Sequence, residues 1–162
     1  MSNCQRIALI LGVVMVFTVV KQDFLVLAQD NRDALCGLQA FPVVVAPLGP
    51  EIEQDGLTGK QLKTDTELKF RMAGIKVISL KEAAQIKGSP YFYLNVRVDK
   101  LKSGCYSYSI STELIEEVFP MWETAWTQLE LLGFSCSLCD VRQQATGMVD
   151  EFINEYLAAN QK

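Results

Sequence analysis

Hydrophobic and polar residues alternate in a helix-then-strand pattern over residues 56–79, and this segment predicts the centre of the fold. Thr58 and Gln61 have the spacing of a capping box, so a helix is expected to begin there. Gly74 is the residue type that ends helices in a left-handed conformation. The β-branched run 75–79 then predicts a short strand. The expected buried face of the helix consists of Leu62, Thr66, Phe70 and Ala73.

One strand is predicted before this unit and a second helix after it. The run 41–46 is almost entirely apolar, which is typical of a strand buried on both faces. Pro42 is expected at the start of that strand, where no ladder donor is needed. Residues 51–55 are charged and predict a loop. Ser79 begins a second capping box, so a short helix is expected over 80–86.

The second half of the chain changes to a period of two, which is typical of strands. Residues 91–98 and 105–118 alternate apolar and polar side chains and predict an antiparallel hairpin with one partly polar face. A further strand is predicted over 123–131, followed by a turn at residues 133–135. Helical spacing then returns and predicts a last helix ending near Ala158.

These elements follow one another in the order β-α-β-α-β-β-β-α. That order predicts an α+β fold with a mixed sheet of about five strands and with helices packed on the sheet. The first strand, the central helix and the strand at 75–79 are expected to form a parallel crossover unit. Residues 29–162 are interpreted as a single domain, since their length is sufficient for one core.

The amino terminus is predicted to be a targeting segment. Residues 7–20 form an apolar run that is short for a bilayer-spanning helix. Val26 and Ala28 resemble the small pair before a signal-peptidase site, which would make Gln29 the first residue of the mature chain. We therefore expect export to the periplasm or the extracellular space, with 1–28 as a cleaved signal peptide and no transmembrane segment in the mature chain. An uncleaved membrane anchor is the alternative.

Composition excludes several classes of chemistry. The formal charge is −4, which argues against nucleic acid as a partner. The chain has no histidine, so it lacks the commonest general base and any Ser-His or Cys-His nucleophilic pair. It has no phosphate-binding glycine loop, and we expect no cofactor and no metal. The carboxylates Glu113, Glu116, Glu117 and Glu123 cluster along the sequence and are interpreted as a solvated rim.

Three segments of the chain carry a resemblance to known proteins: GLT…LKTDTEL…RMAGIKV, PYFYLNV and DEFINEYLAAN. Together they resemble a family of small, uncharacterised exported bacterial proteins over roughly residues 37–162. The order of strands and helices is also similar to that of the small amino-terminal domain of periplasmic TolB-like proteins. The resemblance implies export and an α+β fold, and it implies no catalytic residue.

The most conspicuous motif is Cys136-Ser137-Leu138-Cys139, just before or within the first turn of the last helix. A helix N-terminus can lower a thiol pKa and support disulfide exchange, so Cys136 and Cys139 are a possible redox pair. Structural disulfides are the more ordinary interpretation for an exported chain. The mature chain would contain four cysteines, which allow three complete pairings. These cysteines are Cys36, Cys105, Cys136 and Cys139. A zinc site is a weaker alternative, because Cys36 and Cys105 are isolated.

Aromatic and polar residues on one side of the predicted sheet form a candidate binding surface. Tyrosine and tryptophan are enriched at the energetic centres of protein interfaces. The alternative is that these side chains belong to the core. The residues of the candidate surface are Tyr91, Tyr93, Asn95, Arg97, Trp122 and Trp126.

Three functional hypotheses follow from the sequence. The first is an exported, non-catalytic binding or accessory domain whose partner is a protein or another cell-envelope component. The second is a thiol-disulfide redox protein that uses Cys136 and Cys139. The third is a domain that binds a small molecule between the sheet and the last helix.

Overall fold

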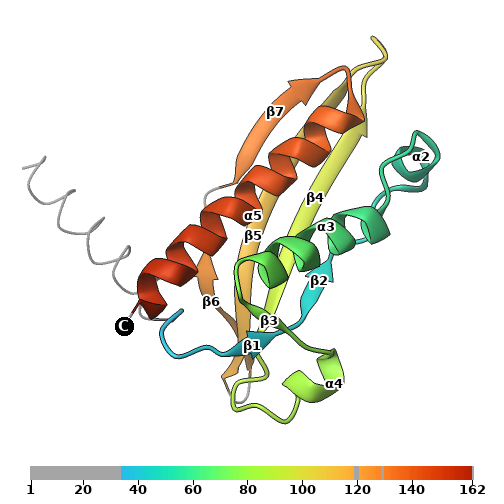
Figure 1. Cartoon of the computed structure of the whole chain (residues 1–162). Coiled ribbons are helices and arrows are strands. Elements are labelled where there is room, and N and C mark those ends of the chain that lie inside the picture. Colours follow the sequence, from blue (N-terminus) through green and yellow to red (C-terminus); the bar gives the residue numbers. More distant parts are fainter. Residues whose placement is uncertain (1–33, 119–120, 129, 162) are drawn as a thin grey trace, which may run out of the picture.

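The computed structural model describes residues 34–118, 121–128 and 130–161. It has an α+β architecture in which two long helices lie side by side on one face of a mixed five-stranded sheet (Figure 1). The helices are α3 (Gly59–Met72) and α5 (Leu138–Asn160). We call the face that they cover the inner face and the opposite one the outer face.

The targeting segment predicted for 1–28 lies outside the described residues. Within the described ranges, no helix combines the length and the apolar character needed to cross a membrane.

The five-stranded sheet is built around the strand β5 (Tyr106–Val118). On one side β5 pairs antiparallel with β4 (Tyr91–Lys100), which in turn pairs in parallel with β2 (Val43–Val45). On its other side β5 pairs with two strands placed end to end, β6 (Met121–Thr127) and β7 (Leu131–Ser135). The predicted hairpin and the mixed character of the sheet are therefore confirmed.

The first predicted strand is divided at Pro42. Its first part, β1 (Ala40–Phe41), pairs in parallel with β3 (Lys76–Val77), as the predicted crossover requires. Its second part is β2, which joins the main sheet. Pro42 therefore lies between two strands, not at the start of one. The Phe92 N–H donates to the carbonyl of Pro42 at 2.9 Å, so this residue contributes its acceptor to the ladder although it has no donor.

Both predicted ends of the central helix are confirmed. The Gln61 N–H donates to the Thr58 hydroxyl at 3.2 Å, and the Thr58 N–H donates to the Gln61 side chain at 2.9 Å. Gly74 has φ +80°, and the Ile75 N–H donates to the carbonyl of Phe70 at 2.8 Å. These are the bonds of a capping box at one end and a Schellman motif at the other.

Two predictions about short segments were wrong: one segment predicted as a loop is helical, and one predicted helix is shorter than expected. The charged segment 51–55 is not a loop, because it contains the short helix α2 (Pro50–Gln54). Proline at the first helical position and the burial of Ile52 explain that helix. The helix expected over 80–86 is confirmed only as α4 (Leu80–Ala83).

The turn predicted at residues 133–135 was also wrong. Gly133 lies within β7, directly opposite Tyr108 of β5. A Cβ atom at Gly133 would lie 2.3 Å from the hydroxyl oxygen of Tyr108, so the glycine makes room for a tyrosine ring across the ladder. The strand predicted over 123–131 is not one element: most of it belongs to β6, which ends at Thr127, and its last residue, Leu131, begins β7.

The core is centred on Phe152 of α5, which is fully buried. Its ring centroid lies 4.7 Å from that of Phe92 and 4.8 Å from that of Trp126, both in the sheet. It lies 5.6 Å from the ring of Phe70 in α3 and 5.8 Å from that of Phe41 in β1. A single side chain therefore joins both long helices to both sheets.

The first described residues are held by the end of α5. The side-chain amide of Asn160 donates to the carbonyl of Leu35 at 2.8 Å, and its oxygen accepts from the Gly37 N–H at 2.9 Å. The Tyr156 hydroxyl donates to the carbonyl of Leu38. These bonds fix the segment that leads into β1 against the last two turns of the helix.

Replacing Phe152 by alanine is expected to lower the free energy of unfolding by about 3–5 kcal/mol, because it leaves a cavity where α5 meets four other elements. Urea unfolding followed by circular dichroism measures this change. Leu157→Ala on the exposed side of the same helix is the control and should change stability by no more than about 0.5 kcal/mol. Equal effects of the two substitutions would contradict the placement of Phe152.

Candidate functional site

The outer face of the five-stranded sheet is the candidate site. Because α3 and α5 both pack on the inner face, no described helix lies over the outer one (Figure 1). Strand alternation places Tyr91, Tyr93, Asn95 and Arg97 of β4 there, as the sequence predicted. The two tyrosines and Asn95 are partly exposed, and Arg97 is exposed.

The strand register extends this face across β5 to β7. Arg97 pairs with Ser109, which pairs in turn with Leu132. One step further along, Ser107 pairs with Phe134. Side chains directly opposite each other project from the same side of a sheet, so Arg97, Leu132 and Phe134 share the outer face. Arg97 and Leu132 are two strands apart, which is roughly 10 Å.

Among the described side chains of this face, the apolar residues Leu132 and Phe134 are highly exposed, at 70% and 78%. Isolated exposed leucines are ordinary on protein surfaces. Here, however, the two residues lie on one edge strand, with short serine side chains beside them on β5. An apolar patch of this kind is typical of a surface that another molecule covers. Sequence analysis missed both residues because Gly133 between them was interpreted as part of a turn.

The tyrosines lie toward the other end of the same face. Tyr93 is directly opposite Glu113, and Tyr91 is opposite Ile115. Burial raises the pKa of Tyr91, and the neighbouring Tyr93 and Glu113 raise it further. Tyr91 therefore stays protonated at neutral pH. The face thus offers aromatic rings at one end and aliphatic and phenyl side chains at the other.

Trp126 does not belong to this surface, which corrects its assignment from the sequence. It is only 1% exposed and lies on the inner face against Phe152. Its indole N–H donates to the Glu155 carboxylate at 2.8 Å. The side chains of Trp122 and Glu123 lie outside the described part of the structure.

The space between the sheet and α5, which was the expected place of a small-molecule site, is filled by protein. The ring of Phe152 occupies it, with its centroid 4.7 Å from that of Phe92 and 4.8 Å from that of Trp126. All three side chains are buried.

The carboxylates of β5 do not form a catalytic pair. Alternation places Glu113 and Glu117 on the outer face and Glu116 on the inner one. Burial raises the pKa of Glu116. Glu113 and Glu117 are four residues apart along one strand, so their Cα atoms are about 13 Å apart. This spacing exceeds the carboxylate separations of glycosidases. These positions are compatible with the predicted rim.

The cysteines occupy the two ends of α5. Cys105, before β5, forms a disulfide with Cys136, after β7. Cys139 is an exposed free thiol in the first turn of α5. Cys36 lies at the far end, where its thiol contacts the carbonyl of Ala159 at 3.4 Å. A helix of this length separates Cys36 from Cys139 by roughly 30 Å, so these two residues cannot be joined within the chain.

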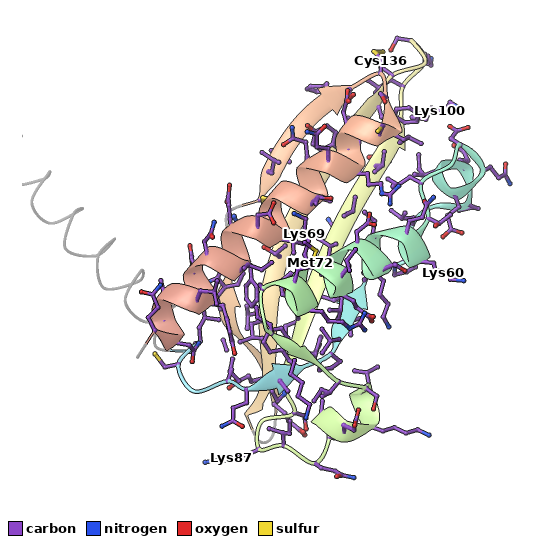
Figure 2. The ribbon with its side chains drawn as sticks, viewed as in Figure 1. Lys60, Lys69, Met72, Lys87, Lys100 and Cys136 are labelled. Atoms are coloured by element: carbon purple, nitrogen blue, oxygen red, sulfur yellow. A yellow bond between two sulfur atoms is a disulfide. The ribbon has the colours of Figure 1, made fainter. Side chains whose placement is uncertain are left out.

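The bond between Cys136 and Cys139 considered from the sequence is thus not the one that the structure contains. Figure 2 shows Cys136 at the same end of the molecule as Lys100, and Lys87 at the opposite end. Among the described residues, no group of three or more cysteine, aspartate or glutamate side chains is placed to hold a metal ion.

A cluster of polar side chains holds the β4–β5 hairpin near the disulfide between Cys105 and Cys136. Asp55 accepts from the Lys100 ammonium at 2.6 Å and from the Tyr106 hydroxyl at 2.8 Å. Both hydrogen bonds lower the pKa of Asp55. The same contact with Asp55 raises the pKa values of Lys100 and Tyr106. The segment after α2 is thereby attached to the end of β4 and the start of β5.

No protein-family model matches the chain, and a search of curated protein sequences finds no significant match.

Acidification should release the contact between Asp55 and Lys100. Because the folded-state pKa of Asp55 is lowered, its contribution to stability is complete above the unfolded value of about 3.9 and is lost as the pH falls through the folded value. The difference in unfolding free energy between wild type and Asp55→Asn should therefore be constant above about pH 5 and shrink below about pH 4.

Urea unfolding at a series of pH values measures this difference. Asp99→Asn controls for the loss of one negative charge, because it removes an exposed carboxylate from β4, next to Lys100. A difference between wild type and Asp55→Asn that does not change with pH would contradict the assignment.

Proposed function

We propose that this chain is an exported, non-catalytic binding or accessory domain that captures a protein partner of the cell envelope through the outer face of its sheet. The observation that supports this most directly is that both long helices cover the inner face, while Leu132 and Phe134 remain exposed on the outer one. The outer face also carries Tyr93 and Arg97, residue types that are frequent at the energetic centres of interfaces.

The edge formed by β7 favours a protein as the partner. On one side β7 pairs with β5, and no described strand pairs with its other side. Edge strands are usually protected by charged residues or proline. The sequence of β7, LLGFS, contains neither. A partner segment in an extended conformation can therefore add to this edge and place its own side chains against Leu132 and Phe134.

Two features support export. The disulfide between Cys105 and Cys136 is typical of proteins that fold in an oxidising compartment. The apolar run at residues 7–20 has the character of a signal sequence.

The complete absence of histidine from the chain adds weight to a binding role, since it removes the most common catalytic base.

Replacing Phe134 by serine should abolish capture of the partner and leave the fold intact. The tagged full chain is immobilised, incubated with envelope extract of its natural host, and the bound proteins are quantified by mass spectrometry. A loss of at least about tenfold is expected, which corresponds to about 1.4 kcal/mol of binding free energy. Arg97→Ala should weaken capture of the same protein.

Met72→Ser is the matched control, because Met72 is 79% exposed on α3 and Phe134 is 78% exposed on β7. It should leave capture unchanged. Equal capture by wild type and Phe134→Ser, or unfolding of the Phe134→Ser protein, would overturn the assignment of this face. Sedimentation of the wild-type chain alone gives a further check: a dimer that Phe134→Ser dissociates would mean that a second copy covers the face.

A further inference from the structure

Three of the described cysteines gather where β7 leads into α5. Cys136 directly precedes the helix cap Ser137 and is bonded to Cys105, while Cys139 carries a free thiol two helical positions later. The Cys139 N–H donates to the Ser137 hydroxyl at 3.2 Å. The free thiol of Cys139 is thus three residues after the disulfide-bonded Cys136. Two intervening residues are also the spacing found between the cysteines of thiol-disulfide exchange proteins.

We propose that these residues form a thiol-disulfide exchange site, in which Cys139 attacks Cys136 and displaces Cys105. This inference concerns a different region from the binding face and does not depend on it. What supports it is the coexistence of a disulfide and a free thiol within one motif.

The turn that carries the motif is compact. The Ser137 N–H donates to the Ser135 hydroxyl at 3.0 Å, and that hydroxyl donates to the carboxylate of Asp140 at 2.8 Å. These bonds draw the two ends of the segment 135–140 together. The segment 135–140, which contains both Cys136 and Cys139, is therefore folded back on itself.

The surroundings of Cys139 suit an attacking sulfur. The side chain is exposed and lies in the first turn of α5, at the end of the helix dipole that favours negative charge. Arg142 follows one turn later, and its guanidinium is held by Asp65 through two bonds of 2.6 and 2.8 Å. Asp140 is the opposing charge, and its carboxylate is engaged by Ser135. An attacking thiol must be accessible, and the exposure of the Cys139 side chain meets this requirement.

The exchange needs no external oxidant or reductant. The Cys139 thiol first loses its proton to solvent, and the thiolate attacks the sulfur of Cys136. The new Cys136–Cys139 bond forms as the Cys105–Cys136 bond breaks, and Cys105 leaves as a thiolate that takes a proton from water. One disulfide and one thiol are present before and after the step.

The product has a different mechanical connection from the starting protein. The original bond links residues 31 positions apart and joins the β4–β5 turn to the start of α5. It also closes the end of the β5–β7 ladder, because Tyr106 and Ser135, the neighbours of the two cysteines, are paired. After exchange the cross-link is local to 136–139, and that end of the ladder loses its covalent connection.

The test uses the full chain with Cys4→Ser and Cys36→Ser, so that only the three cysteines of the motif and its partner remain. The oxidised protein is held at pH 8 with a low concentration of iodoacetamide, quenched with acid and digested without reduction, and each alkylated peptide is identified by mass. Alkylation at Cys105, together with a Cys136–Cys139 peptide, is the expected result. Adding Cys139→Ser should lower Cys105 labelling by at least about tenfold, because the attacking sulfur is gone.

A second variant keeps the proposal testable if the exchanged form is sparse. Cys105→Ser leaves Cys136 and Cys139 as the remaining pair, and oxidation with glutathione disulfide should join them within the folded protein. The proposal is overturned if Cys105 stays unlabelled while Cys139 is fully alkylated. It is equally overturned if the folded Cys105→Ser protein retains two thiols after oxidation.

Discussion

The packing of Phe152 against the sheet is the contact on which the rest of the structure depends. It places α5 along β5, with the Phe152 ring between Phe92 of β4 and Trp126 of β6, and it brings α3 and β1 to the same side, since Phe70 and Phe41 meet the same ring. Once both long helices are committed to the inner face, the described chain has no long helix left for the outer one. The candidate binding surface is therefore a consequence of how the core is assembled.

Features that depend on neighbouring residues were predicted correctly from the sequence. The caps at Thr58 and Ser79, the stop at Gly74 and the alternation in β4 each rest on contacts within a few positions. Features that depend on distant residues were not. Gly133 serves a tyrosine in another strand, and no local pattern distinguishes that role from a turn. The missed residues Leu132 and Phe134 follow from this one misinterpretation.

Trp126 was misplaced for a related reason. Leu114 pairs with Trp126 and the next residue, Ile115, pairs with Thr124, so Ala125 is an extra residue in β6. Such a bulge changes which side chains share a face, and only the register of the partner strand reveals it. The cysteine pairing was beyond sequence for the same physical cause, because it depends on the length of α5 and on which strands meet at its start.

The hydrogen bonds of Asn160 to residues 35 and 37 connect the two ends of the described chain. The segment that they hold leads directly into β1 and β2, which complete the two sheets. The hydrogen bonds of Asn160 thus join residues 123 and 125 positions apart and close the fold between its first and last described elements. The two ends of the described chain therefore behave as one structural unit, in which fraying of the last turn of α5 also releases the strand that opens the fold.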